Sequence, residues 1–317
     1  MSSRHLVDPE LWAGLEMMPT LGFSEEMLAP TRAMMATMIA ERGAVEHPDV
    51  VSEERRIAGP DGNEILLMVH RPRDASGPLP AVLHMHGGGY VIGSAPMSTM
   101  SNQRTVVDAE CVVVSVDYRL APETRHPGPV EDCWAALRWL HDQAGALGVD
   151  PARIAVMGES AGGGLAAALA LLARDRGGAP IAHQHLIYPA IDDRTCTREP
   201  NPYVGEFVWT LESNRFGWSS LLGPDAGSDT AIDYYGAAAR APDLSGLPST
   251  YIAVGALDLF VDEDIDYAQR LIRAGVPTEL HVYPGAFHGF DIAVDATVTK
   301  TAYRNSLAAL RRALHPD

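Results

Sequence analysis

The sequence predicts an α/β protein with a mostly parallel central sheet and helices on both faces. From residue 50 onward, short apolar runs alternate with stretches of helical spacing, the pattern that produces a parallel sheet covered on both sides. Hydrophobic residues make up 46% of the 317 positions, so the chain can bury a large core. The predicted strands span residues 64–69, 81–86, 111–116, 154–157, 185–188, 251–254 and 279–283.

Individual elements have distinct signals. Residues 25–42 carry methionine, leucine and isoleucine at partly helical spacing, which predicts a helix ahead of the alternating region. Residues 111–116 form a β-branched run, Cys-Val-Val-Val-Ser-Val, that is typical of a buried central strand. Further helices are expected over residues 130–143, 161–173, 264–274 and 298–314.

One long segment, residues 192–242, interrupts the alternation because it is rich in aromatic side chains and has no clear strand. We interpret it as an inserted helical cap that folds back together with the N-terminal segment, residues 1–50. The core would then consist of residues 51–191 and 243–317. The alternative is a peripheral helical segment whose aromatic residues only pack against the core. The candidates for lining a substrate pocket are Phe207, Trp209, Trp218 and Phe287.

Composition excludes several classes of partner. The net charge of −17 disfavours binding to nucleic acid and to anionic membranes. Three cysteines without regular spacing predict neither a disulfide framework nor a zinc site. The N-terminal residues lack the apolar core of a signal peptide, and no apolar run approaches the roughly 18 residues of a membrane span. We therefore expect a cytoplasmic protein.

A glycine-flanked serine follows the apolar strand at residues 154–157. The segment Gly158-Glu159-Ser160-Ala161-Gly162 fits the G-x-S-x-G nucleophile elbow, in which a sharp turn exposes the serine oxygen. Three consecutive glycines at the start of the next helix cost roughly 1 kcal/mol each relative to alanine, which indicates a steric demand. The alternative is a glycine-rich turn between strand and helix that carries no chemistry.

A second glycine-rich loop, His86-Gly87-Gly88-Gly89, follows the strand at residues 81–86. Backbone N–H groups in a loop without side chains can point at the oxyanion that forms during acyl transfer. We assign the N–H groups of Gly88, Gly89 and Ala161 to this oxyanion hole. A metal pair formed by His84 and His86 is the alternative, but no accompanying cluster of ligands supports it, and no metal is expected.

A nucleophilic serine needs a histidine base, and the base needs a carboxylate that orients it. Asp258 follows the strand at residues 251–254, and His288 follows the strand at residues 279–283, which gives the chain order Ser, Asp, His. Asp262 and Asp264 compete with Asp258, but they begin the next helix, where acidic residues are common. The sequence therefore predicts a triad of Ser160, Asp258 and His288 at the carboxyl ends of the strands.

With these motifs in place, the sequence resembles the hormone-sensitive-lipase-like family of bacterial esterases (family IV), and in particular its heroin-esterase-like members. The resemblance runs from about residue 50 to the C-terminus. It implies an α/β-hydrolase core, a helical cap from the two segments above, no cofactor, and short-acyl esters as substrates. It also implies that the chain can form a homodimer. The matching motifs are residues 86–89, Tyr118-Arg119-Leu120-Ala121-Pro122-Glu123, residues 158–163 and Phe287-His288-Gly289-Phe290.

Two positions depart from the family pattern. Glu159 stands where Asp or Thr is common, and Leu259-Phe260-Val261 replace the usual Pro-Leu-Arg. We assign no chemical role to the segment of residues 118–123. The sequence as a whole predicts a carboxylic-ester hydrolase with a small-molecule ester substrate. The alternatives are a lactone or activated-amide hydrolase on the same triad, and a non-catalytic ligand-binding module on the same fold.

Overall fold

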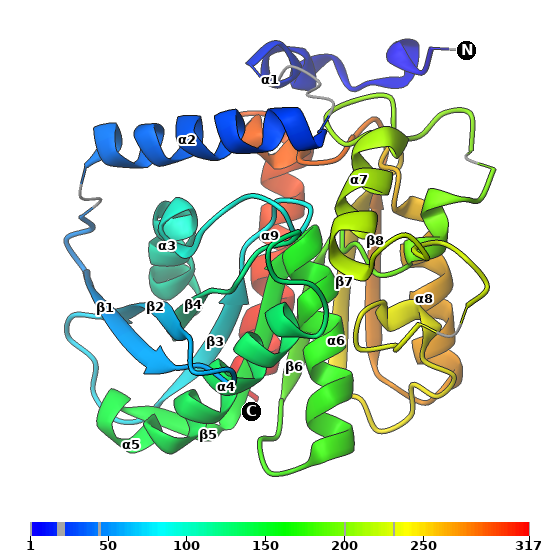
Figure 1. Cartoon of the computed structure of the whole chain (residues 1–317). Coiled ribbons are helices and arrows are strands. Elements are labelled where there is room, and N and C mark those ends of the chain that lie inside the picture. Colours follow the sequence, from blue (N-terminus) through cyan, green and yellow to red (C-terminus); the bar gives the residue numbers. More distant parts are fainter. Residues whose placement is uncertain (1, 18–22, 44–45, 200, 231, 317) are drawn as a thin grey trace.

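The computed structural model describes residues 2–17, 23–43, 46–199, 201–230 and 232–316, and these contain one eight-stranded sheet (Figure 1). Its strands are β1 Val50–Ala58, β2 Glu64–Pro72, β3 Leu79–Met85, β4 Val112–Asp117, β5 Val149–Glu159, β6 His183–Ile187, β7 Ser249–Gly255 and β8 Thr278–Tyr283. They lie in the order β1-β2-β4-β3-β5-β6-β7-β8. The pairs β1–β2 and β2–β4 are antiparallel and all other pairs are parallel, which confirms the predicted mostly parallel sheet.

All seven predicted strands are present with shifted ends, and one strand was missed. Strand β1 carries four charged residues, 53–56, and lies at the edge of the sheet, so most of its side chains face water. An edge strand of this kind has no continuous apolar run for a pattern search to find. Tyr188, included in the predicted strand, lies one residue beyond β6 with φ of +35°.

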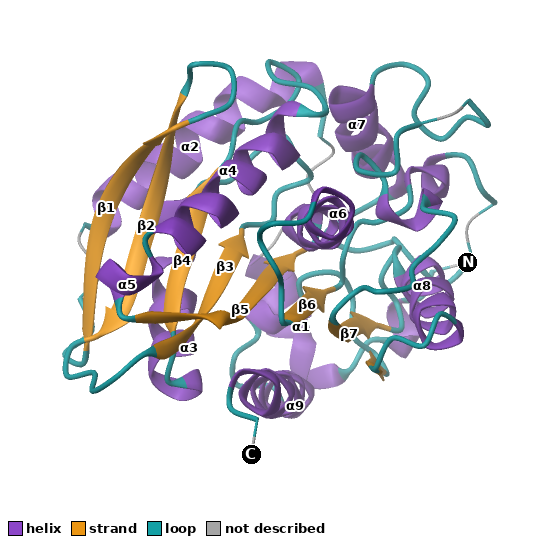
Figure 2. Ribbon diagram, turned by 90° about the horizontal axis from the view of Figure 1, so that it is seen from below, coloured by secondary structure: helices purple, strands orange, loops and turns teal. Residues whose placement is uncertain are grey.

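Helices cover both faces of the sheet. Figure 2 shows helices α4, α6 and α8 on one face, and α3 and α9 on the other. Helix α3 was not predicted, because only part of its sequence, around Val106 and Ala109, is apolar and buried. The helices are α1 Trp12–Met17, α2 Glu25–Arg42, α3 Thr99–Ala109, α4 Gly128–Asp142, α5 Ala144–Leu147, α6 Ala161–Arg176, α7 Leu211–Leu222, α8 Val261–Arg273 and α9 Thr297–Leu314.

The two segments expected to form a cap contact each other. Phe23, just before α2, packs against the Trp209 ring at a centroid distance of 5.5 Å, and its N–H donates to Ser213 Oγ of α7. Arg32 of α2 donates to the carbonyl of Val91, in the loop after β3. Helix α2 thus lies above the carboxyl end of the sheet (Figure 1). Residues 1, 18–22, 44–45, 200 and 231 of these segments lie outside the described residues.

Two further features bear on the expectations from composition. Cys111, Cys133 and Cys196 are buried and free. In the described part of the chain, no helix has the length and apolarity needed to cross a membrane, and no three His, Cys, Asp or Glu side chains group as metal ligands would.

Candidate active site

Ser160 occupies a strained turn between β5 and α6. Its φ of 56° and ψ of −121° place a residue that is not glycine in a sparsely populated region of backbone space, which is common where a reactive side chain must be held outward. The turn also brings α6 close to β3. A Cβ atom on Gly162 would lie 2.1 Å from the carbonyl oxygen of Met85, so only glycine fits there. The predicted elbow is thus present as a tight strand–turn–helix.

The three predicted triad residues meet at the carboxyl end of the sheet. Ser160 Oγ lies 2.9 Å from His288 Nε2, and His288 Nδ1 lies 2.7 Å from Asp258 Oδ2. The serine hydroxyl donates to Nε2, and Nδ1–H donates to the carboxylate. Asp258 is fully buried, whereas Ser160 and His288 each keep 6% of their surface exposed. This arrangement can transfer a proton from the serine oxygen to the histidine.

Of the three aspartates considered as the acid, only Asp258 contacts the histidine. Its other carboxylate oxygen, Oδ1, accepts the backbone N–H of Phe260 at 3.0 Å, which fixes the orientation of the carboxylate. Asp262 is exposed on α8. Asp264 is fully buried, and within the described part of the chain neither of its oxygens has a hydrogen-bond partner. Burial, together with the nearby Glu263 and Asp258, raises the pKa of Asp264 well above its ordinary value.

The raised pKa of Asp264 predicts a stability effect that depends on pH. Above roughly pH 4 the unfolded chain loses this proton while the folded chain keeps it, so the folded state loses stability as pH rises toward the folded-state pKa. The Asp264→Asn variant lacks this effect. We therefore expect its melting temperature, relative to wild type, to increase as the pH rises from about 4 toward the folded-state pKa of Asp264. The underlying difference is at most about 1.4 kcal/mol per pH unit.

Thermal unfolding at several pH values measures this difference. Asp266→Asn, which replaces an exposed carboxylate on the same helix, is the control and should give an offset that does not change with pH. A constant difference between Asp264→Asn and wild type across the same range would contradict the prediction.

The glycine loop lies beside the elbow. Among the described residues, the backbone N–H groups of Gly88, Gly89 and Ala161 donate to no other group of the chain. Gly88 has φ of 127°, and a Cβ there would lie 2.1 Å from the carbonyl oxygen of Ile92, so the loop requires glycine. Tyr118 donates its hydroxyl hydrogen to the His86 carbonyl at 2.7 Å. The hydroxyl of Tyr118 therefore helps to hold the first residue of this loop in position.

The two histidines near this loop have different side-chain neighbours. The His86 ring stacks on Tyr118 at 4.3 Å, and its Nδ1 lies 2.8 Å from the Gly87 carbonyl. Burial lowers the pKa of His86 to about 4. His84 instead contacts Glu159 through Nε2. The two rings thus serve different parts of the site.

The four aromatic pocket candidates occupy different positions. The Trp209 ring lies beside the triad histidine, with its centroid 6.2 Å from that of His288. Its edge also lies against Gly89, where a Cβ would be 2.2 Å from Cη2 of the indole. Phe207 and Phe287 pack against each other at 6.0 Å, and Phe287 is fully buried. Trp218 is 1% exposed and packs on Tyr90, so its side chain belongs to the core.

Two residues that were not predicted contact the His288 ring. The Tyr188 ring lies edge-on at 4.7 Å, and the Phe260 ring is perpendicular at 5.2 Å. Tyr188 also donates its hydroxyl hydrogen to Asp291 at 2.9 Å. The position of Tyr188 immediately after β6, at the carboxyl end of a parallel strand, was the signal available in the sequence.

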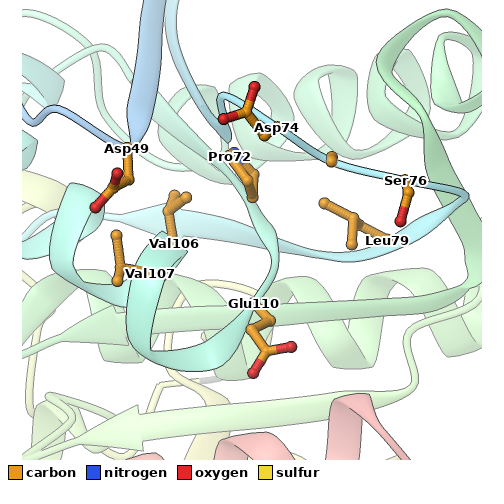
Figure 3. A pocket seen from close by; sticks show the side chains of 9 residues that line it. Asp49, Pro72, Asp74, Ser76, Leu79, Val106, Val107 and Glu110 are labelled. Carbon is orange, nitrogen blue, oxygen red and sulfur yellow. The ribbon is translucent and has the colours of Figure 1, made fainter.

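A hollow of about 410 Å³ lies elsewhere in the molecule (Figure 3). It is lined by Asp49, Asp74 and Glu110, with Val106 among its apolar residues. Leu79, also in its lining, begins β3, so the hollow lies near the opposite end of that strand from the glycine loop. No proposed triad or oxyanion-hole residue lines it.

The chain is similar to known proteins over most of its length. A family model described as an alpha/beta hydrolase fold matches residues 82–292. The carboxylesterase NlhH of Mycobacterium tuberculosis is 36% identical over 319 residues, covering 98% of this chain and 97% of the relative. Ethyl acetate hydrolase of Pseudomonas putida is 33% identical over 251 residues, or 78% of each protein. Among solved structures, a bacterial heroin esterase matches with a TM-score of 0.91 at 40% identity, over 98% of this chain and 99% of that one.

Proposed function

This chain belongs to the α/β-hydrolase fold family, in its hormone-sensitive-lipase-like branch of carboxylesterases, and from this premise we propose that it hydrolyses short-acyl esters through an acyl-enzyme on Ser160. The observation that carries the proposal is the unbroken hydrogen-bonded line from Ser160 through His288 to Asp258, with spacings of 2.9 and 2.7 Å. Nucleophile, base and orienting acid are held within direct proton-transfer reach.

Hydrolysis proceeds in two halves. Ser160 Oγ attacks the ester carbonyl carbon while its proton passes to His288 Nε2, and Asp258 stabilises the resulting imidazolium. The tetrahedral intermediate collapses, and the leaving alcohol takes the proton from Nε2. Water then attacks the acyl-enzyme and gives a proton to the same nitrogen. The carboxylic acid leaves, and Ser160 Oγ regains its proton.

The oxyanion of each tetrahedral intermediate is assigned to the N–H groups of Gly88, Gly89 and Ala161. Their free N–H groups support this role, because donors already used within the fold would be unavailable to substrate. Ala161 is the first residue of α6, so the positive end of that helix adds to the stabilisation of a negative charge.

The position of Trp209 supports short acyl chains. Its indole lies against Gly89 and near His288, so it occupies space beside the reacting carbon. The ring is held in place because Nε1–H donates to Oδ1 of the buried Asn214 at 3.2 Å. A fixed bulky wall beside the nucleophile leaves room for small acyl groups and excludes long ones. The relative named for ethyl acetate hydrolysis is in keeping with this size range.

Hydrolysis of p-nitrophenyl esters of increasing acyl length tests the proposal. Wild type should show its highest kcat/KM on acetate or butyrate. In Trp209→Ala, we expect the ratio of kcat/KM for octanoate over acetate to rise by about tenfold or more, because each methylene admitted to an apolar pocket is worth about 1–3 kcal/mol. Using a ratio cancels any general loss of activity in the variant.

Trp134→Ala provides the matched control, because Trp134 is a partly buried tryptophan of α4 with no contact to the triad. Its octanoate-to-acetate ratio should equal that of wild type. Absence of turnover by wild type on every ester would contradict the proposed function. An unchanged ratio in Trp209→Ala would contradict only the assignment of Trp209 as the wall that limits acyl length.

A further inference from the structure

Glu159, the residue immediately before the nucleophile, has a side-chain partner on the neighbouring strand. Its two carboxylate oxygens lie 3.0 and 3.2 Å from Nε2 of His84. The His84 side chain is 1% exposed, and that of Glu159 is 28% exposed. Glu159 is also a position where this sequence departs from the pattern of its family. The proposed triad mechanism leaves both side chains without a role.

The surrounding groups determine which nitrogen of His84 carries its proton. The amide nitrogen of Asn102 lies 3.3 Å from His84 Nδ1, and an amide N–H₂ can only donate. Ser115 Oγ lies 2.9 Å from the same nitrogen and can donate to it as well. Nδ1 therefore accepts, the proton is on Nε2, and Nε2–H donates to the Glu159 carboxylate. Ser115 and Asn102 thus orient the ring, and the ring holds Glu159.

This contact joins the two strands that carry the two halves of the site. His84 is in β3, two residues ahead of His86 and the glycine loop, whereas Glu159 ends β5 and leads directly into Ser160. The backbones are also in close contact here. A Cβ on Gly87 would lie 3.1 Å from the Glu159 carbonyl oxygen. The separation between oxyanion donors and nucleophile therefore depends on how β3 and β5 meet at this point.

Charge gives the contact a second consequence. A carboxylate adjacent in sequence to the nucleophile opposes the negative charge that develops on the substrate oxygen. The hydrogen bond to His84 holds the Glu159 carboxylate against strand β3. An unheld glutamate side chain would sample several rotamers beside the reaction centre.

We propose that His84 and Glu159 are positioning residues, whose hydrogen bond sets the glycine loop against the nucleophile elbow and holds the Glu159 carboxylate in one place. The proposal rests on the assignment of Ser160 as nucleophile and adds to it. In this proposal, both side chains act through the glycine loop and the nucleophile elbow and have no assigned contact with substrate. Removing the contact should lower kcat, because a displacement of about 1 Å between reacting groups slows catalysis strongly. KM should stay nearly unchanged.

Two substitutions at Glu159 distinguish the effect of losing the hydrogen bond to His84 from the effect of losing the negative charge. Glu159→Asp keeps the charge and shortens the side chain by one methylene, so it cannot reach His84, and kcat on p-nitrophenyl acetate should fall about tenfold or more. Glu159→Gln keeps the length and an accepting oxygen, so kcat should stay within about threefold of wild type. KM should change less than about twofold in both variants. Equal losses of kcat in the two variants would overturn the proposal.

A pair of buried histidines controls for general destabilisation. His70 on β2 is also buried, and its Nδ1 lies 2.8 Å from Ser52 Oγ. It has no contact with Glu159. His84→Asn and His70→Asn should lower the melting temperature by similar amounts. Only His84→Asn should lower kcat, by about tenfold or more. A loss of kcat in His70→Asn equal to that in His84→Asn would overturn the positioning role.

These outcomes are distinguishable from a failure of the proposed mechanism. If the Ser160→Ala variant were active, the proposed mechanism itself would be contradicted. An inactive Ser160→Ala together with wild-type kcat in Glu159→Asp and His84→Asn would overturn only the positioning role of the two residues.

Discussion

Replacing Ser160 by alanine is expected to lower kcat on p-nitrophenyl acetate by about 10⁴-fold or more. Among the described residues, Ser160 carries the only hydroxyl that donates to His288 Nε2, at a distance of 2.9 Å. Without this hydroxyl no acyl-enzyme can form. Residual activity would come from oxyanion donors acting on a bound water. Initial rates for wild type and variant at saturating ester, measured side by side, give the ratio.

The chain offers a matched serine–histidine pair for comparison. Ser249 Oγ lies 2.9 Å from His183 Nδ1, at the opposite end of the sheet strands from the triad. Ser249→Ala should therefore keep kcat close to that of wild type. Unchanged hydrolysis by Ser160→Ala would eliminate this serine as the nucleophile.

Replacing Asp258 by asparagine is expected to lower kcat by roughly 10⁴-fold while leaving the fold intact. The Phe260 N–H donates to Oδ1 at 3.0 Å, so the amide oxygen of the asparagine would keep that position. Its NH₂ group would then face His288 Nδ1 in place of the carboxylate oxygen that lies there at 2.7 Å. An amide that donates to Nδ1 moves the ring proton to Nε2, and Nε2 can then no longer accept the proton of Ser160.

Asp262→Asn is the control for this experiment, because Asp262 is exposed on the same loop-to-helix junction and has no contact with His288. We expect its kcat to remain within about twofold of wild type, in line with a surface substitution away from the site. Comparable kcat values in Asp258→Asn and wild type would show that another group orients the base. The pair of variants also tests the choice of Asp258 over Asp262.

Much of the proposed reaction centre was predictable because its residues follow strands in a parallel sheet. The carboxyl ends of such strands meet at one edge, so Ser160, Asp258 and His288 could be brought together from their order and their strand ends alone. The elbow and the glycine loop were recognisable for a similar reason. Some of their glycines answer local steric demands that act within a short span of chain, such as the Ile92 carbonyl beside Gly88.

Elements that depend on distant partners were less predictable. Strand β1 and helix α3 carry mixed polar and apolar residues, because each is covered on only part of its surface. The lining of the substrate pocket was also hard to predict from the sequence. Trp209, Trp218 and Phe287 are all large and aromatic in sequence, yet only Trp209 has its ring near His288.

The sequence by itself determined the fold class, the order of the proposed catalytic residues and the glycine positions, because these follow from the period of apolar residues and from backbone sterics. The tertiary structure alone decided that Glu159 meets His84, that Tyr188 lies against His288, and that Asp264 is buried with no hydrogen-bond partner among the described residues. Each of these depends on side chains from elements far apart in the chain. Their distances, burial and electrostatic environment arise only when the sheet, the helices and the loops above them pack together.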